Sequence, residues 1–354
     1  MMSIQQLRKK IDAIDWQVVS WLNKRAEISR KIGKEKLKHK KGIYAPDREK
    51  EVLDRIKTLN KGPMSYEAFE AIYREIMSCS LSLEKPLEIG YMGPQASFSN
   101  LAALRKFGSQ VNYVPCEDIS QVFHRVETGE CDYGVVPIEN SIEGAVTHTF
   151  DLLVDSDLRI CSQVLLEIEH NLLSNAPIEK IRTVYSNPQV FGQCRNWLHG
   201  HLPKADWVEV SSTTRAAQIV SKKKNAGCIA SVLAAKVYDL KIIKRNIEDS
   251  LHNITRFLVI AKTDVPPTGK DRTSILFSIK DKVGALQEML APFRRNKINL
   301  TKIESRPSKK KAWDYYFFVD FQGHRLDPKV NKALGQLESK CNYLKILGSY
   351  PIVE

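Results

Sequence analysis

The chain has 354 residues, of which 43% are hydrophobic and 27% are charged, a composition typical of a globular protein. This length exceeds what one ordinary core contains, so we expect two or three domains. No apolar run approaches the roughly 20 residues that cross a bilayer, which argues against a membrane partner. The net charge of +13 is compatible with nucleic-acid binding, but the aromatic residues are not interleaved with the basic runs and no nucleic-acid motif is present. We therefore expect no nucleic-acid partner and assign the positive charge to sites for small anionic substrates.

The cysteines and the N-terminus indicate the compartment. The seven cysteines are scattered, and none belongs to a C-x-x-C pair. The N-terminal stretch MMSIQQLRKKIDAIDW has neither an apolar signal core nor a cleavage site of small residues. These features predict a cytoplasmic protein with reduced thiols. The one close histidine pair, His199 and His201, has no ligand companion nearby, so we expect no metal site and no cofactor.

Residues 3–84 contain no convincing strand and predict three helices. The first carries apolar residues with the 3–4 alternation of a coiled-coil seam: Ile4, Leu7, Ile11, Ile14, Val18, Trp21, Ile28 and Ile32. A break at Lys41-Gly42 precedes a second helix that opens at Pro46, and Ser65 can cap the third. A first helix of about 60 Å cannot form a compact monomeric core with two shorter ones, so we expect an intertwined dimer or a higher homo-oligomer.

Polar side chains interrupt this seam. Arg25 takes the next inward position after Trp21, and Lys36 shares its face of the helix. A guanidinium on a core stripe is costly unless it is paired, so these two cations can converge on one small dianion. Ser80 and Glu84 extend the apolar stripe of the third helix inward by i+4 steps. The alternative is a helical hairpin with a salt bridge and lysines that reach solvent, but the set as a whole favours an anion site.

The segments LRKKIDAID, LNKRAEISRKIGKEK, DREKEVLDRI and SCSLSLE resemble the all-helical chorismate mutase family. The resemblance implies a site lined by Arg25, Lys36, Arg48, Glu49, Ser80 and Glu84, completed by Arg8 from a partner subunit. Arg8 lies roughly 25 Å along the helix from Arg25, so it cannot serve the same pocket within one subunit. The rearrangement of chorismate needs a folded conformer and positive charge at the ether oxygen. Arginine side chains that bind the two carboxylates can hold the folded conformer, and Lys36 can supply the charge at the ether oxygen.

Two positions depart from this family. Ala45 replaces an aspartate that contacts the substrate hydroxyl in many members, so that contact is missing or comes from the backbone. Glu84 replaces a glutamine found in some members. A carboxyl group donates to the ether oxygen only when it is protonated, so we expect the mutase rate to fall toward alkaline pH.

From Leu87 onward, short apolar strands alternate with helices, which predicts an α/β module of two lobes with loops facing a cleft. A lone serine or threonine in such loops is more often a cap or turn residue than a catalyst, and no G-x-S-x-G turn indicates acyl transfer. Together, however, GPQASFS, PIENSIEG, VYSNPQVFGQC and NITRF resemble prephenate dehydratase over about Leu87 to Lys262. The resemblance implies a fold like that of periplasmic binding proteins, with prephenate in the cleft.

The same resemblance implies roles for particular residues. Thr255 is the hydroxyl that assists loss of the ring hydroxide, Arg256 is a carboxylate partner, and Phe257 forms part of the wall. Further site residues, by motif match, are Ser97, Glu139, Asn140, Ser141, Ser186 and Gln193.

A polar, proline-containing linker, Thr263–Arg272, precedes a βαββαβ order typical of a ferredoxin-like sandwich. GALQEML and LTKIESRP resemble the ACT regulatory domains attached to prephenate dehydratases. The resemblance implies that phenylalanine binds at a subunit interface near Gly284, Ala285, Leu286, Glu304 and Ser305. The helix N-terminus after Gly284 suits an amino-acid carboxylate. The alternative is a purely structural dimerisation domain.

The three resemblances predict a multidomain protein: an all-helical mutase module at 1–86, a two-lobed dehydratase module at 87–264 and an ACT module at 271–354. The predicted function is a bifunctional enzyme, an isomerase that converts chorismate to prephenate and a lyase that converts prephenate to phenylpyruvate, with phenylalanine as feedback inhibitor. Two alternatives remain open: a second module that acts on arogenate, and a ligand-binding protein without enzymatic activity that uses the helices to dimerise.

Overall fold

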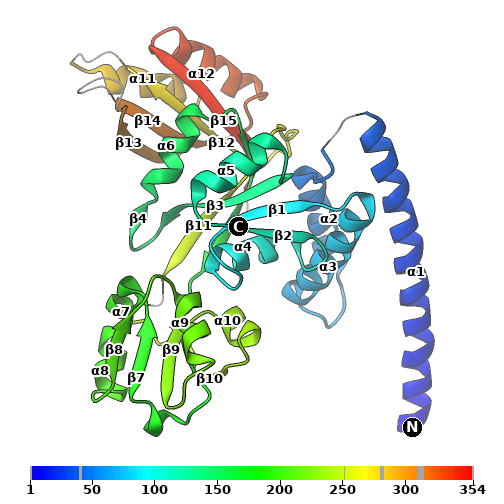
Figure 1. Cartoon of the computed structure of the whole chain (residues 1–354). Coiled ribbons are helices and arrows are strands. Elements are labelled where there is room, and N and C mark those ends of the chain that lie inside the picture. Colours follow the sequence, from blue (N-terminus) through cyan, green and yellow to red (C-terminus); the bar gives the residue numbers. More distant parts are fainter. Residues whose placement is uncertain (1, 40–41, 251, 280–282, 309–314, 353–354) are drawn as a thin grey trace. The chain divides into compact units, whose positions relative to one another are not determined.

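The computed structural model describes residues 2–39, 42–250, 252–279, 283–308 and 315–352 (Figure 1). The chain divides into two compact units, Met1–Glu88 with Lys106–Asn112 and Ile89–Arg105 with Tyr113–Glu354. None of the described helices is both long and apolar enough to cross a membrane.

The first unit is built from the three predicted helices: α1 (Ile4–Lys38), α2 (Pro46–Leu59) and α3 (Tyr66–Glu84). Ser3 and Gln6 form a capping box that starts α1, and Ser65 accepts the amide of Ala68 to start α3, as predicted. Proline at its first position starts α2. Of the predicted break, Lys41 lies outside the described residues.

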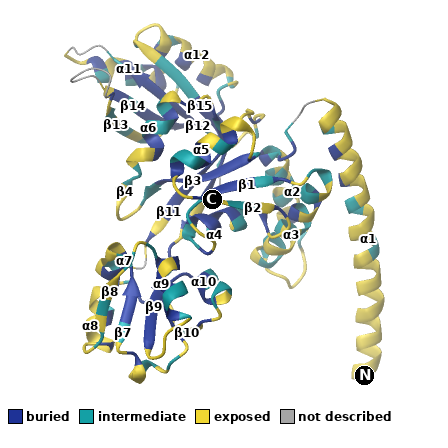
Figure 2. Ribbon diagram, in the orientation of Figure 1, coloured by how far each residue is buried: buried dark blue, intermediate teal, exposed yellow. Residues whose placement is uncertain are grey.

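The two faces of α1 differ in their environment. Its buried residues, Ser29 and Gly33, are small and face α3. A Cβ atom at Gly33 would lie 2.7 Å from the Cα of Glu84, so glycine is what allows the two helices to approach here. The eight apolar residues of the predicted seam are instead 46–71% exposed, and Figure 2 shows α1 exposed along most of its length. The seam therefore has no cover within one chain.

The second unit begins with two α/β lobes, as predicted. The sheet of the first lobe has the order β2-β1-β3-β11-β5, with β4 paired to β3. Its elements are β1 (Glu88–Met92), α4 (Phe98–Phe107), β2 (Asn112–Cys116), α5 (Ile119–Thr128), β3 (Tyr133–Asn140), β4 (Gly144–Ala145), α6 (Thr147–Asp155), β5 (Arg159–Glu167) and β11 (Ile254–Ala261). Strands β3 and β11 are antiparallel, and their register sets Thr255 opposite Asn140.

The sheet of the second lobe has the order β10-β6-β9-β7-β8. Its elements are β6 (Asn171–Ser174), a 3₁₀ turn (Ile178–Lys180), β7 (Thr183–Ser186), α7 (Pro188–Gln193), α8 (Arg195–His201), β8 (Asp206–Glu209), α9 (Thr213–Val220), β9 (Ala226–Ala230), α10 (Val232–Val237) and β10 (Lys241–Lys244). The chain enters this lobe after β5 and returns to the first lobe at β11, so the loops at both crossings lie where the lobes join.

The C-terminal module has the predicted ferredoxin-like fold. Its elements are β12 (Asp271–Ser278), α11 (Ala285–Arg295), β13 (Leu300–Pro307), β14 (Tyr315–Gln322), α12 (Pro328–Glu338) and β15 (Tyr343–Pro351). The sheet has the order β13-β14-β12-β15, and all its pairs are antiparallel. Pro292 lies inside α11.

This C-terminal sheet is buried on both faces. Ile275 and Phe277 of β12 pack into a core with α11 and α12, whereas Leu276 joins the core of the first lobe. On that second face, the rings of Phe150 and Phe318 meet at 4.7 Å between centroids. The predicted linker Thr263–Arg272 thus connects two modules that share one hydrophobic core.

Strand β15 lies directly against β5 of the first lobe. A Cβ atom at Gly348 would lie 2.1 Å from the carbonyl oxygen of Ile160, so only glycine permits this approach. Nearby, Lys345 Nζ donates to the carbonyl oxygens of Leu153, Val154 and Ser156, and so satisfies the C-terminal end of α6. The contacts hold the C-terminal module firmly on the first lobe.

Candidate active sites

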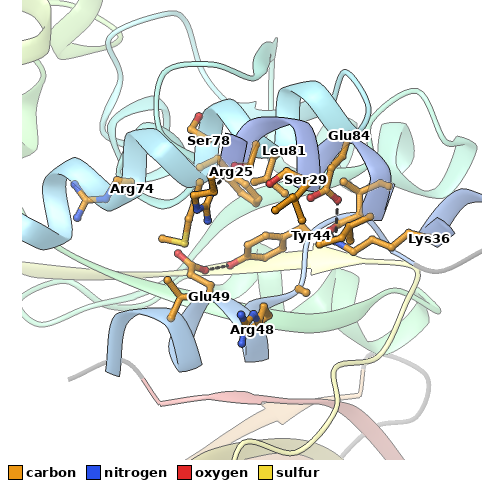
Figure 3. A pocket seen from close by; sticks show the side chains of 18 of the residues that line it. Arg25, Ser29, Lys36, Tyr44, Arg48, Glu49, Arg74, Ser78, Leu81 and Glu84 are labelled. Atoms are coloured by element: carbon orange, nitrogen blue, oxygen red, sulfur yellow. Dashed lines mark hydrogen bonds and ion pairs between the residues drawn. The ribbon is translucent and has the colours of Figure 1, made fainter. Parts of the chain in front are cut away.

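A pocket of about 740 Å³ lies entirely within the helical unit (Figure 3). Its volume falls in the range of small-molecule sites. Charged and polar side chains from all three helices, from the segment between α1 and α2 and from the end of α4 line it: Lys24, Arg25, Ser29, Lys36, Tyr44, Arg48, Glu49, Arg74, Ser78, Ser80, Glu84 and Lys106. Six of these are cations and two are carboxylates, which favours an anionic ligand.

Arg25 and Lys36 are both held by partners on α3. The Nη1 atom of Arg25 donates to Oγ of Ser80, which itself donates to the carbonyl oxygen of Ile76 at 2.9 Å. Lys36 Nζ donates to Oε2 of Glu84 at 2.9 Å and to the carbonyl oxygen of Ile43 at 2.6 Å. These contacts preorganise both cations before any ligand is bound.

The opposite wall holds Glu49, near the start of α2. Its Oε2 atom accepts the hydroxyl of Tyr44 at 2.6 Å and pairs with Lys106 Nζ at 2.9 Å. Figure 3 shows Tyr44 reaching toward Glu49, and Lys36 reaching toward Glu84. Arg48 pairs with Glu51 and remains half exposed, so its guanidinium can turn toward a ligand.

The structure brings together six of the residues that the sequence assigned to this site: Arg25, Lys36, Arg48, Glu49, Ser80 and Glu84. Arg8 lies exposed on α1 and is not among the residues that line the pocket. Tyr44, Arg74 and Lys106 line it but were not predicted. Tyr44 adjoins Ala45 and was open to prediction, whereas Lys106 carries no local signal because it reaches the pocket only through the tertiary fold.

A second cluster lies where the two lobes join, and we call Asn140, His170, Gln193, Asn253 and Thr255 the hydroxyl–amide cluster. Asn140 Nδ2 donates to Thr255 Oγ1 at 2.8 Å and to Asn253 Oδ1 at 2.6 Å. Asn253 Nδ2 and His170 Nε2 both donate to Gln193 Oε1, at 3.1 and 2.7 Å. The cluster joins residues from both lobes through neutral hydrogen bonds.

His170 is the buried end of this cluster. Burial lowers the pKa of the imidazole, against the opposing effect of the hydrogen bond to Gln193, so the ring is neutral near pH 7. Its Nδ1 atom is buried and has no hydrogen-bond partner among the described residues. The rings of Phe98 and His170 meet edge to face, with 5.8 Å between centroids. Neither His170 nor Asn253 was predicted, although Asn253 opens the NITRF motif.

Several other predicted dehydratase residues have structural partners. Ser97 Oγ donates to the carbonyl oxygen of Met92 and accepts the amide of Asn100 at the start of α4. Ser186 is fully buried and donates to the carbonyl oxygen of Ile229. For Ser141, Oγ bridges the backbone of residues 252 and 254. Phe257 is buried within β11. These residues shape the lobes around the cluster.

Arg256 is placed differently from the expectation. Its guanidinium donates to Glu139 at 2.9 Å, Asp320 at 2.7 Å, Tyr350 at 2.8 Å and Gln163 at 3.0 Å. Burial opposes the charged form, but these ion pairs outweigh it and raise the pKa of Arg256. The side chain therefore ties β11 to the C-terminal module rather than presenting a free fork to a substrate carboxylate.

Glu139 links this network to the C-terminal strand β13. Its carboxylate accepts from both Arg256 and Lys302. Burial alone would raise the pKa of Glu139, but the hydrogen bonds from Lys302 and Arg256 prevail and lower it. A residue predicted to line the dehydratase site is thus joined to a strand that carries the predicted phenylalanine-binding motif.

The predicted effector residues lie at two places in the C-terminal module. Gly284 has φ +78° at the N-terminus of α11 and is exposed, and it is followed by the buried Ala285 and the half-buried Leu286. Glu304 and Ser305 lie on β13, which among the described strands pairs only with β14. Ser305 is exposed and Glu304 is half-buried, so this edge is open to a ligand or a second subunit.

Family models match the chain in three successive segments: chorismate mutase type II at residues 7–85, prephenate dehydratase at 89–265 and the ACT domain at 273–339. A bifunctional chorismate mutase/prephenate dehydratase from Aquifex aeolicus is 49% identical, over 99% of this chain and 98% of that protein. The arogenate dehydratase 2 of Petunia hybrida is 37% identical, over 75% of this chain and 72% of that protein.

A solved structure of prephenate dehydratase from Arthrobacter aurescens in complex with L-Phe superposes with a TM-score of 0.70 and 31% identity, over 75% of this chain and 90% of that chain. Together with the relative that matches along nearly the full length, this likeness confirms the three predicted resemblances. The chain belongs to the family of bifunctional chorismate mutase/prephenate dehydratases that carry a C-terminal ACT domain.

Proposed function

We propose that the chain rearranges chorismate to prephenate in the pocket of the helical unit and converts prephenate to phenylpyruvate at the hydroxyl–amide cluster. The observation that carries the first assignment is the position of Arg25 and Lys36. Both line one pocket of suitable size and are held there by Ser80 and Glu84. The cluster around Thr255 supports the second assignment.

The mutase reaction requires no nucleophile. Arg25 and Arg48 are suited to grip the two carboxylates of chorismate, which holds the ring and its side chain in the reactive fold. Lys36 and Glu84 are already paired across the pocket and can meet the ether oxygen, where negative charge develops in the transition state. Glu49 can accept the ring hydroxyl, a contact that Ala45 cannot make.

A second subunit completes this site. The eight exposed apolar residues of α1 form a stripe that a soluble monomer would not leave open. Covering it with α1 of another copy would bury the stripe and bring Arg8 of the partner subunit toward the pocket. Sedimentation of the purified protein tests this: Ile14→Glu should dissociate the assembly and lower mutase activity, while an unchanged assembly would refute the stripe as the interface.

The dehydratase reaction expels carbon dioxide and the ring hydroxide, and the poor leaving group needs a proton donor or a polarising hydrogen bond. Thr255 Oγ1 accepts a hydrogen bond from Asn140, so its own hydrogen is available for donation to the departing hydroxyl. Asn253, Gln193 and neutral His170 fix the orientation of Asn140. Thr255 therefore acts by orientation and polarisation.

Phenylalanine is the proposed effector, bound at the ACT module near Gly284 and Glu304. The Arthrobacter aurescens prephenate dehydratase was solved with L-Phe and superposes on 75% of this chain, which carries an ACT domain at residues 273–339. We place the enzyme in the cytoplasm, in keeping with its seven scattered cysteines, none of which belongs to a C-x-x-C pair.

One assay tests the proposal as a whole. Purified protein added to chorismate should cause loss of chorismate absorbance, with prephenate as intermediate and phenylpyruvate as product. Phenylalanine should inhibit the second step more than the first. The same protein assayed with arogenate beside prephenate separates the two dehydratase activities: faster turnover of arogenate would assign the second module to phenylalanine formation directly.

A further inference from the structure

Lys106 belongs by sequence to one module and by structure to another. It lies in the last turn of α4, inside the segment that the prephenate dehydratase model matches. Yet Lys106 and Phe107 line the mutase pocket, and residues Lys106–Asn112 belong to the helical unit. The segment matched by the chorismate mutase model, residues 7–85, therefore lacks part of its own pocket wall.

Hydrogen bonds to α3 hold this segment in place. The amide of Gln110 donates to Ser78 Oγ at 2.9 Å, and the amide and hydroxyl of Ser109 both donate to Glu75 Oε2. The ring of Phe107 also packs on Tyr44, with 4.9 Å between centroids. Because several independent contacts fix the segment, the position of Lys106 does not depend on its ion pair alone.

The ammonium group of Lys106 meets Glu49 within the pocket wall. Lys106 Nζ lies 2.9 Å from Glu49 Oε2, and the two side chains are only 12% and 17% exposed. Nζ also lies 5.7 Å from the centre of the Tyr44 ring, whose hydroxyl donates to the same Oε2. Two donors on one oxygen restrict rotation of the carboxylate and direct its other oxygen, Oε1, away from them.

The negative charge of Glu49, in a pocket proposed to bind a dianion, needs a nearby cation to balance it. Without a nearby cation, Glu49 would repel both carboxylates of the substrate in a partly desolvated site. Removing one member of a buried ion pair leaves the other uncompensated, which costs more than the pair contributes. Lys106 supplies that compensation at the Glu49 wall, opposite Arg25 and Lys36 on the first helix.

We propose that Lys106 is a positioning residue of the mutase reaction, supplied by the dehydratase segment, which orients Glu49 to accept the ring hydroxyl of chorismate. This inference rests on the proposed mutase site. It makes the mutase site dependent on a residue 22 positions beyond the end of its own helices.

The test uses the full-length protein and measures the kinetics of both reactions. Lys106→Met should raise the mutase KM about tenfold with a smaller change in kcat, because a charge-assisted contact that binds ground state and transition state alike is lost. Lys106→Arg should restore most of the affinity. Arg105→Met is the matched control, since Arg105 is the adjacent exposed cation on α4, and it should leave both activities unchanged. Dehydratase activity of each variant reports on folding.

A double-mutant cycle with Glu49→Gln decides whether Lys106 acts through Glu49. If it does, Lys106→Met should add little to the defect of Glu49→Gln. An unaltered mutase KM in Lys106→Met, or full additivity with Glu49→Gln, would overturn the inference. A different result would refute the proposed mutase site itself: mutase activity that is unaffected by Glu49→Gln alone. Should Lys106→Met lose both activities through misfolding, Tyr44→Phe removes the other donor to Oε2 and must raise the mutase KM for the inference to stand.

Discussion

The two proposed sites differ in the charge of the side chains that form them. The pocket of the helical unit is lined by cations that outnumber its two carboxylates, and each carboxylate is ion-paired with one of the cations. The members of the hydroxyl–amide cluster in the second unit are joined by neutral hydrogen bonds, and burial keeps the imidazole uncharged; one carboxylate, Glu143, accepts from Gln193. The difference follows the chemistry: a rearrangement is accelerated by charge placed against a folded dianion, whereas loss of a hydroxide needs a single oriented donor.

Removing charge from the first site should have the largest effect. We expect Arg25→Ala to lower mutase kcat/KM by about 10³-fold, because a preorganised guanidinium and its fork on a carboxylate are lost together. Dehydratase activity of the same protein should persist. Arg30→Ala, an exposed arginine on the same helix, is the control. Undiminished mutase activity in Arg25→Ala would show that the cations do not carry the reaction.

Removing the oriented hydroxyl from the second site should come next. Thr255→Val keeps the shape of the side chain, and we expect it to lower dehydratase kcat by about 10²-fold. Thr255→Ser should retain much of the rate because the hydroxyl remains beside Asn140. Mutase activity serves as the internal control. Near-normal dehydratase turnover in Thr255→Val would remove the cluster from the mechanism.

The pH dependence of the dehydratase should sharpen the contrast. The dehydratase rate should stay flat over pH 7–9, because burial lowers the pKa of His170 and keeps the ring neutral there. At the first site, Glu84 is ion-paired with Lys36, so the carboxylate acts as an acceptor and Lys36 is the donor that can meet the ether oxygen. A dehydratase rate that changes several-fold between pH 7 and pH 9 would contradict a neutral His170 in the cluster.

The smallest expected effect concerns the charged network beside the second site. The pKa of Glu139 lies below its ordinary value of 4.5, so its contribution to stability is present above that pH and is lost as the pH falls through the lower, folded-state value. Glu139→Gln should therefore lower the thermal unfolding midpoint by a few degrees at pH 7, and the gap from wild type should close below about pH 4.5. A gap that stays constant from pH 7 to pH 3 would contradict this ionic role.

Much of this architecture was open to prediction. The 3–4 alternation of α1, the change to short strands at Leu87 and the βαββαβ order of the C-terminal module all appear in the structure as expected. The helical spacing predicts that Arg25 and Lys36 share one face of α1, and the resemblance of NITRF to prephenate dehydratases implies the role of Thr255. The face of α1 that packs within the chain was harder to assign. The apolar stripe of α1 is exposed, whereas the small residues Ser29 and Gly33 are the buried ones.

Periodicity and sequence motifs depend on residues that are neighbours along the chain. By themselves they predicted the fold of each module, the family and most of the candidate site residues. Only the tertiary structure decided which of these side chains meet. It brought Lys106 to Glu49 and turned Arg256 toward Asp320. The physical reason is that such contacts depend on packing between segments far apart in sequence, where a close approach at Gly33 or Gly348 sets positions that no local pattern records.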